Sequence, residues 1–230
     1  MRPFGVARYA EHRTRLVDGD GRVFAGHLDE SAGGVPRAVV VIHDFYGLTQ
    51  PVRTAATRLA ADGFVVFAPD LYRGRVATSP ADAGALASQL AWDQVALELG
   101  LVVAALRRRS AGMKVATLGF AMGGAASLVA AAALPDLAAA VTYYGVPQDV
   151  VLRNRRVRVL GHFGARDVKV TPPRVDALAA MFATHGIDGR LHRYDAAGNF
   201  ANPLLPEVFD AAAADTAWQR TLAFLHETLG

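Results

Sequence analysis

Two kinds of side chain that can move a proton stand at the ends of apolar runs in this chain. Asp44 follows the β-branched run 38–43, and Tyr144 ends the run that starts at Leu137. A carboxylate beside aromatic residues, such as Phe45 here, can have a raised pKa and act as a general acid or base. A tyrosine hydroxyl can donate a hydrogen bond to an enolate or carboxylate oxygen. The pattern predicts isomerisation, epimerisation, elimination or cyclisation of a small carbonyl compound without a covalent intermediate.

The segment Gly119-Phe-Ala-Met-Gly-Gly124 has the spacing of a nucleophile elbow, a sharp turn between a strand and a helix. Its glycines permit the turn, and its central side chain is placed at a helix N-terminus. In an acyl-transfer enzyme that side chain is serine or cysteine, and backbone N–H groups stabilise the developing oxyanion. The central residue here is Ala121, whose methyl group cannot attack a carbonyl.

Apolar runs and helical patterns alternate along the chain after a hairpin at 14–28, whose turn is Asp18-Gly-Asp-Gly, and a loop at 31–36. Such alternation predicts an α/β fold with a doubly wound, mostly parallel sheet and helices on both faces. We expect a single domain spanning residues 1–230. The expected strands are 38–43, 64–68, 115–120, 137–144, 157–163 and 190–194, and the expected helices are 52–62, 80–109, 122–133, 173–184 and 210–228.

Ligands of such sheets bind beyond the carboxyl ends of the strands, where polar residues follow each expected strand here. Arg73 could hold an anion as a bidentate pair. Tyr72 and Asn199 could hydrogen-bond a ligand, whereas Asp70 is expected to brace its own loop. The small Ala121 makes room in the expected pocket. The candidate substrate-binding residues are His43, Phe45, Tyr72, Arg73, Ala121, Met122, Asn199 and Phe200.

Composition excludes several other classes of protein. The 230 residues are 52% hydrophobic with a formal net charge of +3, which argues against disorder. The absence of cysteine excludes a disulfide scaffold, and no His-x-x-His spacing indicates a metal site.

Nucleotide cofactors, nucleic acids and membranes are not expected as partners either. The glycine motif lacks the Lys-Ser/Thr of a phosphate loop. The arginine runs 107–109 and 153–158 have no interleaved aromatics. Apolar runs fall short of the roughly 20 residues of a membrane span, and no signal-peptide core follows Met1. We therefore expect a cytoplasmic protein with a small-molecule ligand and no cofactor, and leave its oligomeric state open.

Six segments, spread from about residue 14 to the end of the chain, carry a family resemblance. They are His43-Asp-Phe-Tyr-Gly47, Ala68-Pro-Asp-Leu-Tyr72, Gly119-Phe-Ala-Met-Gly-Gly124, Tyr143-Tyr-Gly145, His162-Phe-Gly-Ala-Arg-Asp167 and Tyr194-Asp-Ala-Ala-Gly-Asn-Phe200. Together they make the chain resemble the dienelactone hydrolase family of α/β-hydrolase-fold enzymes. The resemblance implies a Cys–His–Asp triad that hydrolyses a small lactone or ester.

The triad implied by the resemblance is degenerate here. Ala121 stands at the nucleophile position. Between Gly198 and Phe200, where the family usually has two residues beginning with His, this chain has only Asn199, so the base is either replaced or deleted. The acid position is kept as Asp167, a further candidate catalytic residue, although it could persist only to accept loop N–H groups.

Other positions also bear on that resemblance. Asp44 stands where the family usually has a glutamate, and Arg73 and Arg75 lie near its site for a substrate carboxylate. Two separate departures favour natural loss of the triad over an engineered alanine, which would leave the histidine in place.

Another histidine could act as the base. The candidates are His43, His162 and His192. The alternative for His162 is a structural hydrogen bond near Asp167.

Three functions follow from these observations. The first is a non-hydrolytic catalyst of acid–base chemistry on a small carbonyl, acyl or lactone-like compound, for example in specialised metabolism. The second is a pseudoenzyme or ligand-binding protein without turnover. The third is an ester or lactone hydrolase seen as a nucleophile-to-alanine variant.

Overall fold

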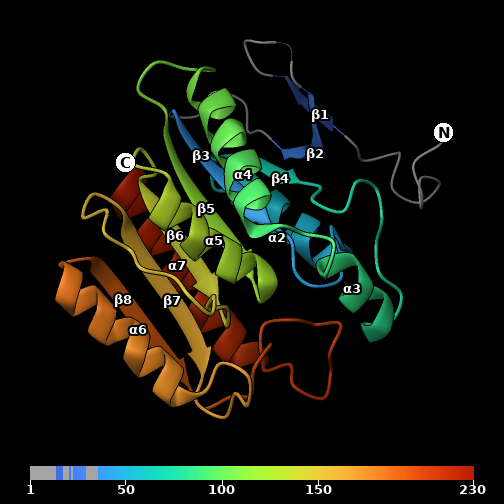
Figure 1. Ribbon diagram of the computed structural model, residues 1–230, viewed down its shortest axis with the longest axis vertical. Helices are drawn as coiled ribbons and strands as arrows, with labels where there is room; N and C mark the ends of the chain where they lie inside the picture. The colour runs from blue at the N-terminus through green and yellow to red at the C-terminus, as the bar shows by residue number, and fades with distance from the viewer. Residues whose placement is uncertain (1–13, 18–20, 22, 30–35) are drawn as a thin grey trace. The chain divides into compact units, whose positions relative to one another are not determined.

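The computed structural model describes residues 14–17, 21, 23–29 and 36–230, which form two compact units (Figure 1). The first unit is Met1–Val115 and the second is Ala116–Gly230. Most of the expected turn at 18–21 and of the loop at 31–36 lies outside the described residues. The expectation of a single domain stays a prediction.

The described part of the first unit joins a mixed set of strands to helices α2, α3 and α4. Strands β1 and β2 are antiparallel, β2 and β4 are antiparallel, and β3 and β4 are parallel, in the order β1-β2-β4-β3. Helix α4 lies in front of these strands in Figure 1 and α2 lies behind them. The elements are β1 Thr14–Val17, β2 Val23–Asp29, β3 Arg37–Ile42, α2 Gln50–Ala61, β4 Val65–Pro69, α3 Pro80–Ala87 and α4 Trp92–Arg107.

Helices α3 and α4 correct the prediction of one long helix over 80–109. The chain leaves the helix after Ser88 and starts again after Ala91, with an 80° bend between the two helices. No glycine or proline marks this break. The Ser88 hydroxyl and the Gln89 amide both donate to the Ala85 carbonyl, and such side-chain bonds compete with continuation of the helix.

No single described helix is long and apolar enough to cross a membrane. The bent pair of α3 and α4 would meet that test by length and composition alone.

The second unit is built from parallel strands and alternating helices, as the sequence predicts. Strands run in the order β5-β6-β7-β8, and each neighbouring pair is parallel. Figure 1 shows α5 and α6 in front of these strands and α7 behind them. The elements are β5 Lys114–Phe120, which begins just before the unit, α5 Met122–Ala133, β6 Ala139–Tyr143, β7 Arg158–Gly164, α6 Pro172–His185, β8 Asp188–Tyr194 and α7 Ala211–Leu229.

Small residues let α5 approach β6 closely. A Cβ atom added to Gly124 would lie 2.5 Å from Thr142 Oγ1 and 3.0 Å from the Tyr143 carbonyl oxygen. On the same helix, Ser127 is hydrogen-bonded to Thr117 of β5 at 2.7 Å, with both side chains fully buried. The helix that begins at the elbow is therefore held directly on the strands.

We predict that Gly124→Ala destabilises the protein. The added methyl group has no room against Thr142 and the β6 backbone, so overpacking should lower the free energy of unfolding by roughly 1–3 kcal/mol. Urea unfolding followed by circular dichroism measures this change.

Gly84→Ala is the matched control, because its Cβ would only touch the Phe45 ring at 3.9 Å within α3. Alanine there should stabilise the protein by about 0.5–1 kcal/mol. A stable Gly124→Ala protein would contradict the tight contact of α5 on β6.

Candidate active site

The turn between β5 and α5 has a backbone conformation that alanine disfavours. Ala121 has φ 50° and ψ −111°. Its N–H donates to the Tyr143 carbonyl at 2.9 Å, and its own carbonyl accepts from the Ala125 N–H at 3.0 Å. A strained φ/ψ pair of this kind costs on the order of 1–3 kcal/mol and persists only where the surroundings over-determine it. The turn is thus a sharp strand-to-helix elbow, as the glycine spacing predicts.

Gly119 and Gly145 permit this turn because neither position has room for a Cβ atom. A Cβ on Gly119 would lie 2.0 Å from the Gly123 carbonyl oxygen, and a Cβ on Gly145 would lie 2.1 Å from the Ala121 carbonyl oxygen. No side chain caps the N-terminus of α5. The partial positive charge of that helix end therefore faces a position that carries only a methyl group.

Among the described residues other than glycine, left-handed backbone occurs at positions that the sequence singles out. Among the described residues, the non-glycine positions with positive φ are Arg73 at 58°, Ala121 at 50°, Tyr144 at 42° and Asn199 at 60°. Asparagine tolerates this conformation, but alanine and tyrosine do so rarely. All four are predicted site residues, and strain of this type is typical of functional sites.

The second unit brings the ends of β6, β7 and β8 together. The rings of Tyr144 and Phe200 lie 5.5 Å apart, and the Tyr144 N–H donates to the His162 carbonyl at 2.7 Å. A Cβ on Gly198 would lie 2.5 Å from Asp167 Oδ2, so the loop carrying Asn199 passes against that carboxylate. The geometry places these predicted residues in one neighbourhood.

Asp167 also braces its own loop. Its Oδ1 accepts from the N–H groups of Lys169 at 2.7 Å and Val170 at 3.0 Å, and the residue is only 7% exposed. The loop-bracing role that the sequence leaves open is therefore present, whatever else the carboxylate does.

His162 is hydrogen-bonded through both ring nitrogens to residues other than Asp167. Arg220 donates to the Tyr194 hydroxyl at 3.1 Å, which leaves the hydroxyl proton for Nδ1 of His162 at 2.8 Å. Nε2 then carries the ring proton and donates to Thr221 at 3.0 Å, and Thr221 is bonded to Tyr143 at 2.7 Å.

Burial, assisted by the charges of His192 and Arg220, holds the pKa of His162 well below its usual value. His162 is therefore a neutral structural residue.

Asp44 has the properties of an acid–base group in the first unit. It is 7% exposed, its Oδ1 accepts from the Tyr46 N–H at 2.8 Å, and its carbonyl accepts from the Gly47 N–H at 3.2 Å. Burial raises the pKa of Asp44 to about 6, although backbone hydrogen bonds from Tyr46 and Gly47 act to lower it. Both protonation states are therefore accessible near neutral pH.

His43 and Tyr72 lie next to this carboxylate. Their rings are 4.7 Å apart, and the Tyr72 hydroxyl donates to the Phe45 carbonyl at 3.1 Å. Burial, then the charge of Asp44, raises the pKa of Tyr72 to about 12. His43 donates from Nδ1 to the Asp44 carbonyl at 2.8 Å, and burial lowers the pKa of His43 to about 4. Its buried Nε2 has no hydrogen-bond partner among the described residues.

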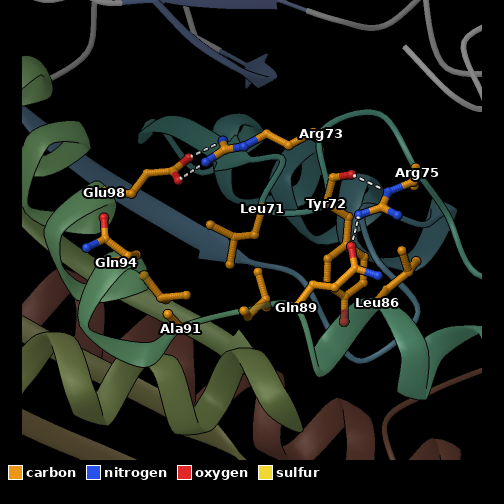
Figure 2. Close-up of a pocket in the computed structure, with 11 residues that line it drawn as sticks. Leu71, Tyr72, Arg73, Arg75, Leu86, Gln89, Ala91, Gln94 and Glu98 are labelled. Carbon is orange, nitrogen blue, oxygen red and sulfur yellow. Dashed lines mark hydrogen bonds and ion pairs between the residues drawn. The ribbon is translucent and has the colours of Figure 1, made fainter.

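Arg73 makes a bidentate pair, but with a side chain of this protein. Its two terminal nitrogens donate to the Glu98 carboxylate of α4 at 2.8 and 2.6 Å (Figure 2). Asp70 braces the loop beneath, as expected, by accepting from the N–H groups of Tyr72 and Gly74. The loop after β4 and the segment 86–98 line a cavity of about 240 Å³.

No group of three or more histidine or acidic residues that could hold a metal ion occurs in the described part of the chain.

Parallel strands, crossover helices and a strained elbow after a strand define the α/β-hydrolase fold. The chain belongs to the dienelactone hydrolase family, whose model matches residues 24–229. This confirms the resemblance noted in the sequence.

Individual relatives agree with that assignment. The chain is 32% identical over 216 residues to "Protein usf" of Aquifex pyrophilus, covering 89% of this chain and 93% of the relative. It is 30% identical over 211 residues to "Carboxymethylenebutenolidase" of Rhodococcus opacus, covering 83% and 81%. Its fold is similar to that of a dienelactone hydrolase-like promiscuous phosphotriesterase, P91, from metagenomic libraries, with a TM-score of 0.83, 24% identity and coverage of 95% and 98%.

Sequence reasoning missed the residues that hold the candidates in place. Glu98, Thr221 and Arg220 lie on helices, 25 or more residues from the side chains they bond. No local spacing indicates such pairs. The positive φ of Tyr144 likewise has no signal in the residue type.

We predict that Asp44→Asn stabilises the protein at high pH. The raised pKa means that the native state binds protons more tightly than the unfolded state between pH 3.8 and about 6. The stability that comes from protonated Asp44 is complete below pH 3.8 and lost above about pH 6.

The variant should therefore exceed the parent by roughly 1–3 kcal/mol at about pH 8, and this difference should disappear near about pH 4. Urea unfolding over this pH range measures it. Asp149→Asn, at an exposed carboxylate, is the control and should show no such trend. A difference that stays constant with pH would contradict the buried titration of Asp44.

Proposed function

We propose that this protein binds a small carbonyl, acyl or lactone-like compound and changes it by proton transfer, with Asp44 as the acid–base residue. Membership of the dienelactone hydrolase family supports the substrate class, since a relative is named carboxymethylenebutenolidase. Ala121 and Asn199 support a mechanism without an acyl-enzyme, because neither side chain can act as nucleophile or as imidazole base.

The observation that carries this proposal is the place of Asp44, a carboxylate only 7% exposed that follows the His43 ring packed on Tyr72 and accepts from the Tyr46 N–H. A general base works best when its pKa lies near the working pH, and burial brings the pKa of Asp44 to about 6. Its aromatic neighbour Tyr72, with a pKa of about 12, keeps its proton and donates it to the Phe45 carbonyl, which leaves Asp44 as the group that titrates. In the proposed step Asp44 takes a proton from the carbon beside the carbonyl and returns it at another position.

The hydrolase hypothesis is a second candidate, and the elbow is the observation that favours it. Ala121 has the strained backbone conformation of the central residue of a nucleophile elbow, although its methyl group cannot act as a nucleophile. A chain whose nucleophile alone had been exchanged would look the same at this turn. A ligand-binding protein without turnover is the third candidate, and it differs only in the absence of product.

Hydrogen exchange tests the proposal whatever product the reaction forms. A panel of small ketones, lactones and unsaturated esters is incubated with the protein in D2O, and NMR follows deuterium uptake beside the carbonyl. The parent should exchange at least one compound, with a rate that rises through about pH 6 as Asp44 ionises. Asp44→Asn should lose this activity by about 10²-fold or more. Equal rates of deuterium exchange in the parent and in Asp44→Asn would show that Asp44 is not the acid–base residue.

Restoring a thiol separates the hydrolase hypothesis from the proposal. We expect Ala121→Cys to hydrolyse p-nitrophenyl acetate no faster than Ala126→Cys, which places the same thiol inside α5. The N-terminus of α5 favours a thiolate at position 121, but without an imidazole base no group activates the water that would release an acyl group from it. Steady turnover of p-nitrophenyl acetate after acylation of the introduced thiol, which mass spectrometry detects, would instead favour a lost hydrolase.

A further inference from the structure

The loop that follows β3 and the loop that follows β4 lie against each other in the first unit. A Cβ atom added to Gly47 would be 3.1 Å from the Arg75 carbonyl oxygen and 3.1 Å from Cδ2 of Tyr72. The Ala77 N–H donates to the Tyr46 carbonyl at 2.9 Å. Because the two loops are in contact, a side chain of one can fix a backbone group of the other.

Tyr72 reaches a peptide group of the neighbouring loop. It is only 1% exposed, and its hydroxyl donates to the Phe45 carbonyl at 3.1 Å. The N–H of Tyr46 belongs to the same peptide unit and donates to Oδ1 of Asp44 at 2.8 Å. Because a trans peptide unit is planar, its carbonyl and its N–H point in opposite directions and turn together. The hydroxyl of Tyr72 is thus joined to the carboxylate of Asp44 through one rigid group.

Tyr72 is itself held in place at its ring and at its backbone. The ring lies 4.7 Å from that of His43, and Oδ1 of Asp70 accepts from the Tyr72 N–H at 3.2 Å. Arg75 donates from Nε to the Tyr72 carbonyl at 3.3 Å and from Nη2 to Gln89 at 2.8 Å, as Figure 2 shows. The hydroxyl therefore belongs to a fixed side chain.

The ionisable groups around this peptide titrate in separate ranges of pH. Burial is the main reason that the pKa of Tyr72 is raised to about 12; the charge of Asp44 raises it as well, and the charge of Arg75 lowers it. Burial lowers the pKa of His43 to about 4. Near neutral pH, Tyr72 therefore keeps the proton that it donates, His43 is uncharged, and Asp44 is the one of these three that titrates.

We infer that Tyr72 is a positioning residue: its hydroxyl holds the Phe45 carbonyl, so that the N–H at the other end of that peptide is directed at the carboxylate of Asp44. Without this bond the peptide can rotate, and the carboxylate loses a donor that stabilises its charged form. The inference rests on the proposed function only for its consequence in catalysis. The arrangement itself is measurable without turnover.

Carbon NMR of the full chain, with aspartate isotope-labelled at the carboxyl carbon, measures the titration of Asp44. Its signal is the one that Asp44→Asn lacks. Tyr72→Phe removes the hydroxyl and keeps the ring against His43. We expect this variant to raise the pKa of Asp44 by roughly 1, which is the effect of losing one hydrogen bond to a charged group. An unchanged or lowered pKa would overturn the role of Tyr72.

Tyr46→Phe is the matched control. It removes a hydroxyl from the same loop but leaves the Tyr46 N–H in place, so the pKa of Asp44 should stay at its value in the parent. An equal rise in both variants would contradict the inference, because it would show that the effect does not depend on the bond from Tyr72 to the Phe45 carbonyl.

A second measurement uses the parent protein alone, in case Tyr72→Phe does not fold. The Tyr46 amide proton signal should move with the titration of Asp44, because its N–H donates to a carboxyl group that gains or loses a proton. The Tyr72 hydroxyl proton should exchange slowly with water, since it is donated in a buried contact. An amide signal that does not follow the titration, or a rapidly exchanging hydroxyl proton, would overturn the inference.

The consequence for the proposed reaction is a change in its pH dependence. In the hydrogen-exchange assay, the rate of Tyr72→Phe should rise at a higher pH than the rate of the parent, by the same interval as the pKa of Asp44. A lower rate with an unmoved pH profile would indicate a merely structural role and contradict the inference. If the parent exchanges no compound, the proposed function fails, whereas the NMR titration still decides the role of Tyr72.

Discussion

The strained turn at Ala121 is the constraint on which the second unit depends. Ala121 has a backbone conformation that L-residues rarely adopt. Its N–H donates to the carbonyl of Tyr143 in β6, and Gly119 and Gly145 leave room for the turn. Relaxing the turn would move the first residues of α5 away from β6, against which Gly124 is packed. Strain of this kind is retained in proteins where a position is needed for binding or chemistry. The second unit thus has a sharp strand-to-helix elbow with alanine at its centre.

Burial shifts the pKa values of the neighbouring side chains Asp44 and His43 in opposite directions. It raises the pKa of Asp44 to about 6, so that this carboxyl group can be protonated or ionised near neutral pH. It lowers the pKa of His43 to about 4, so that the imidazole is uncharged there. In the second unit, His162 is neutral for the same reason, but both of its nitrogens are bonded. Burial therefore brings the pKa of Asp44 towards neutral pH and keeps His43 and His162 uncharged.

Family membership establishes the fold and the kind of compound that relatives are named for, whereas chemistry depends on individual side chains. In this chain the elbow carries Ala121, and the Asp167 carboxylate lies beside the loop that carries Asn199. The guanidinium of Arg73 is paired with Glu98.

The order of strands and helices, the elbow and the family were all predictable from the sequence, because apolar periodicity and glycine spacing are local properties. The break between α3 and α4 was not predictable, because it depends on hydrogen bonds from the Ser88 and Gln89 side chains. No glycine or proline occurs at this point of the sequence. The partner of Arg73, the hydrogen bonds of His162 and the left-handed backbone of Tyr144 were also decided only in three dimensions. Each depends on residues distant in the chain that packing alone brings within hydrogen-bonding range.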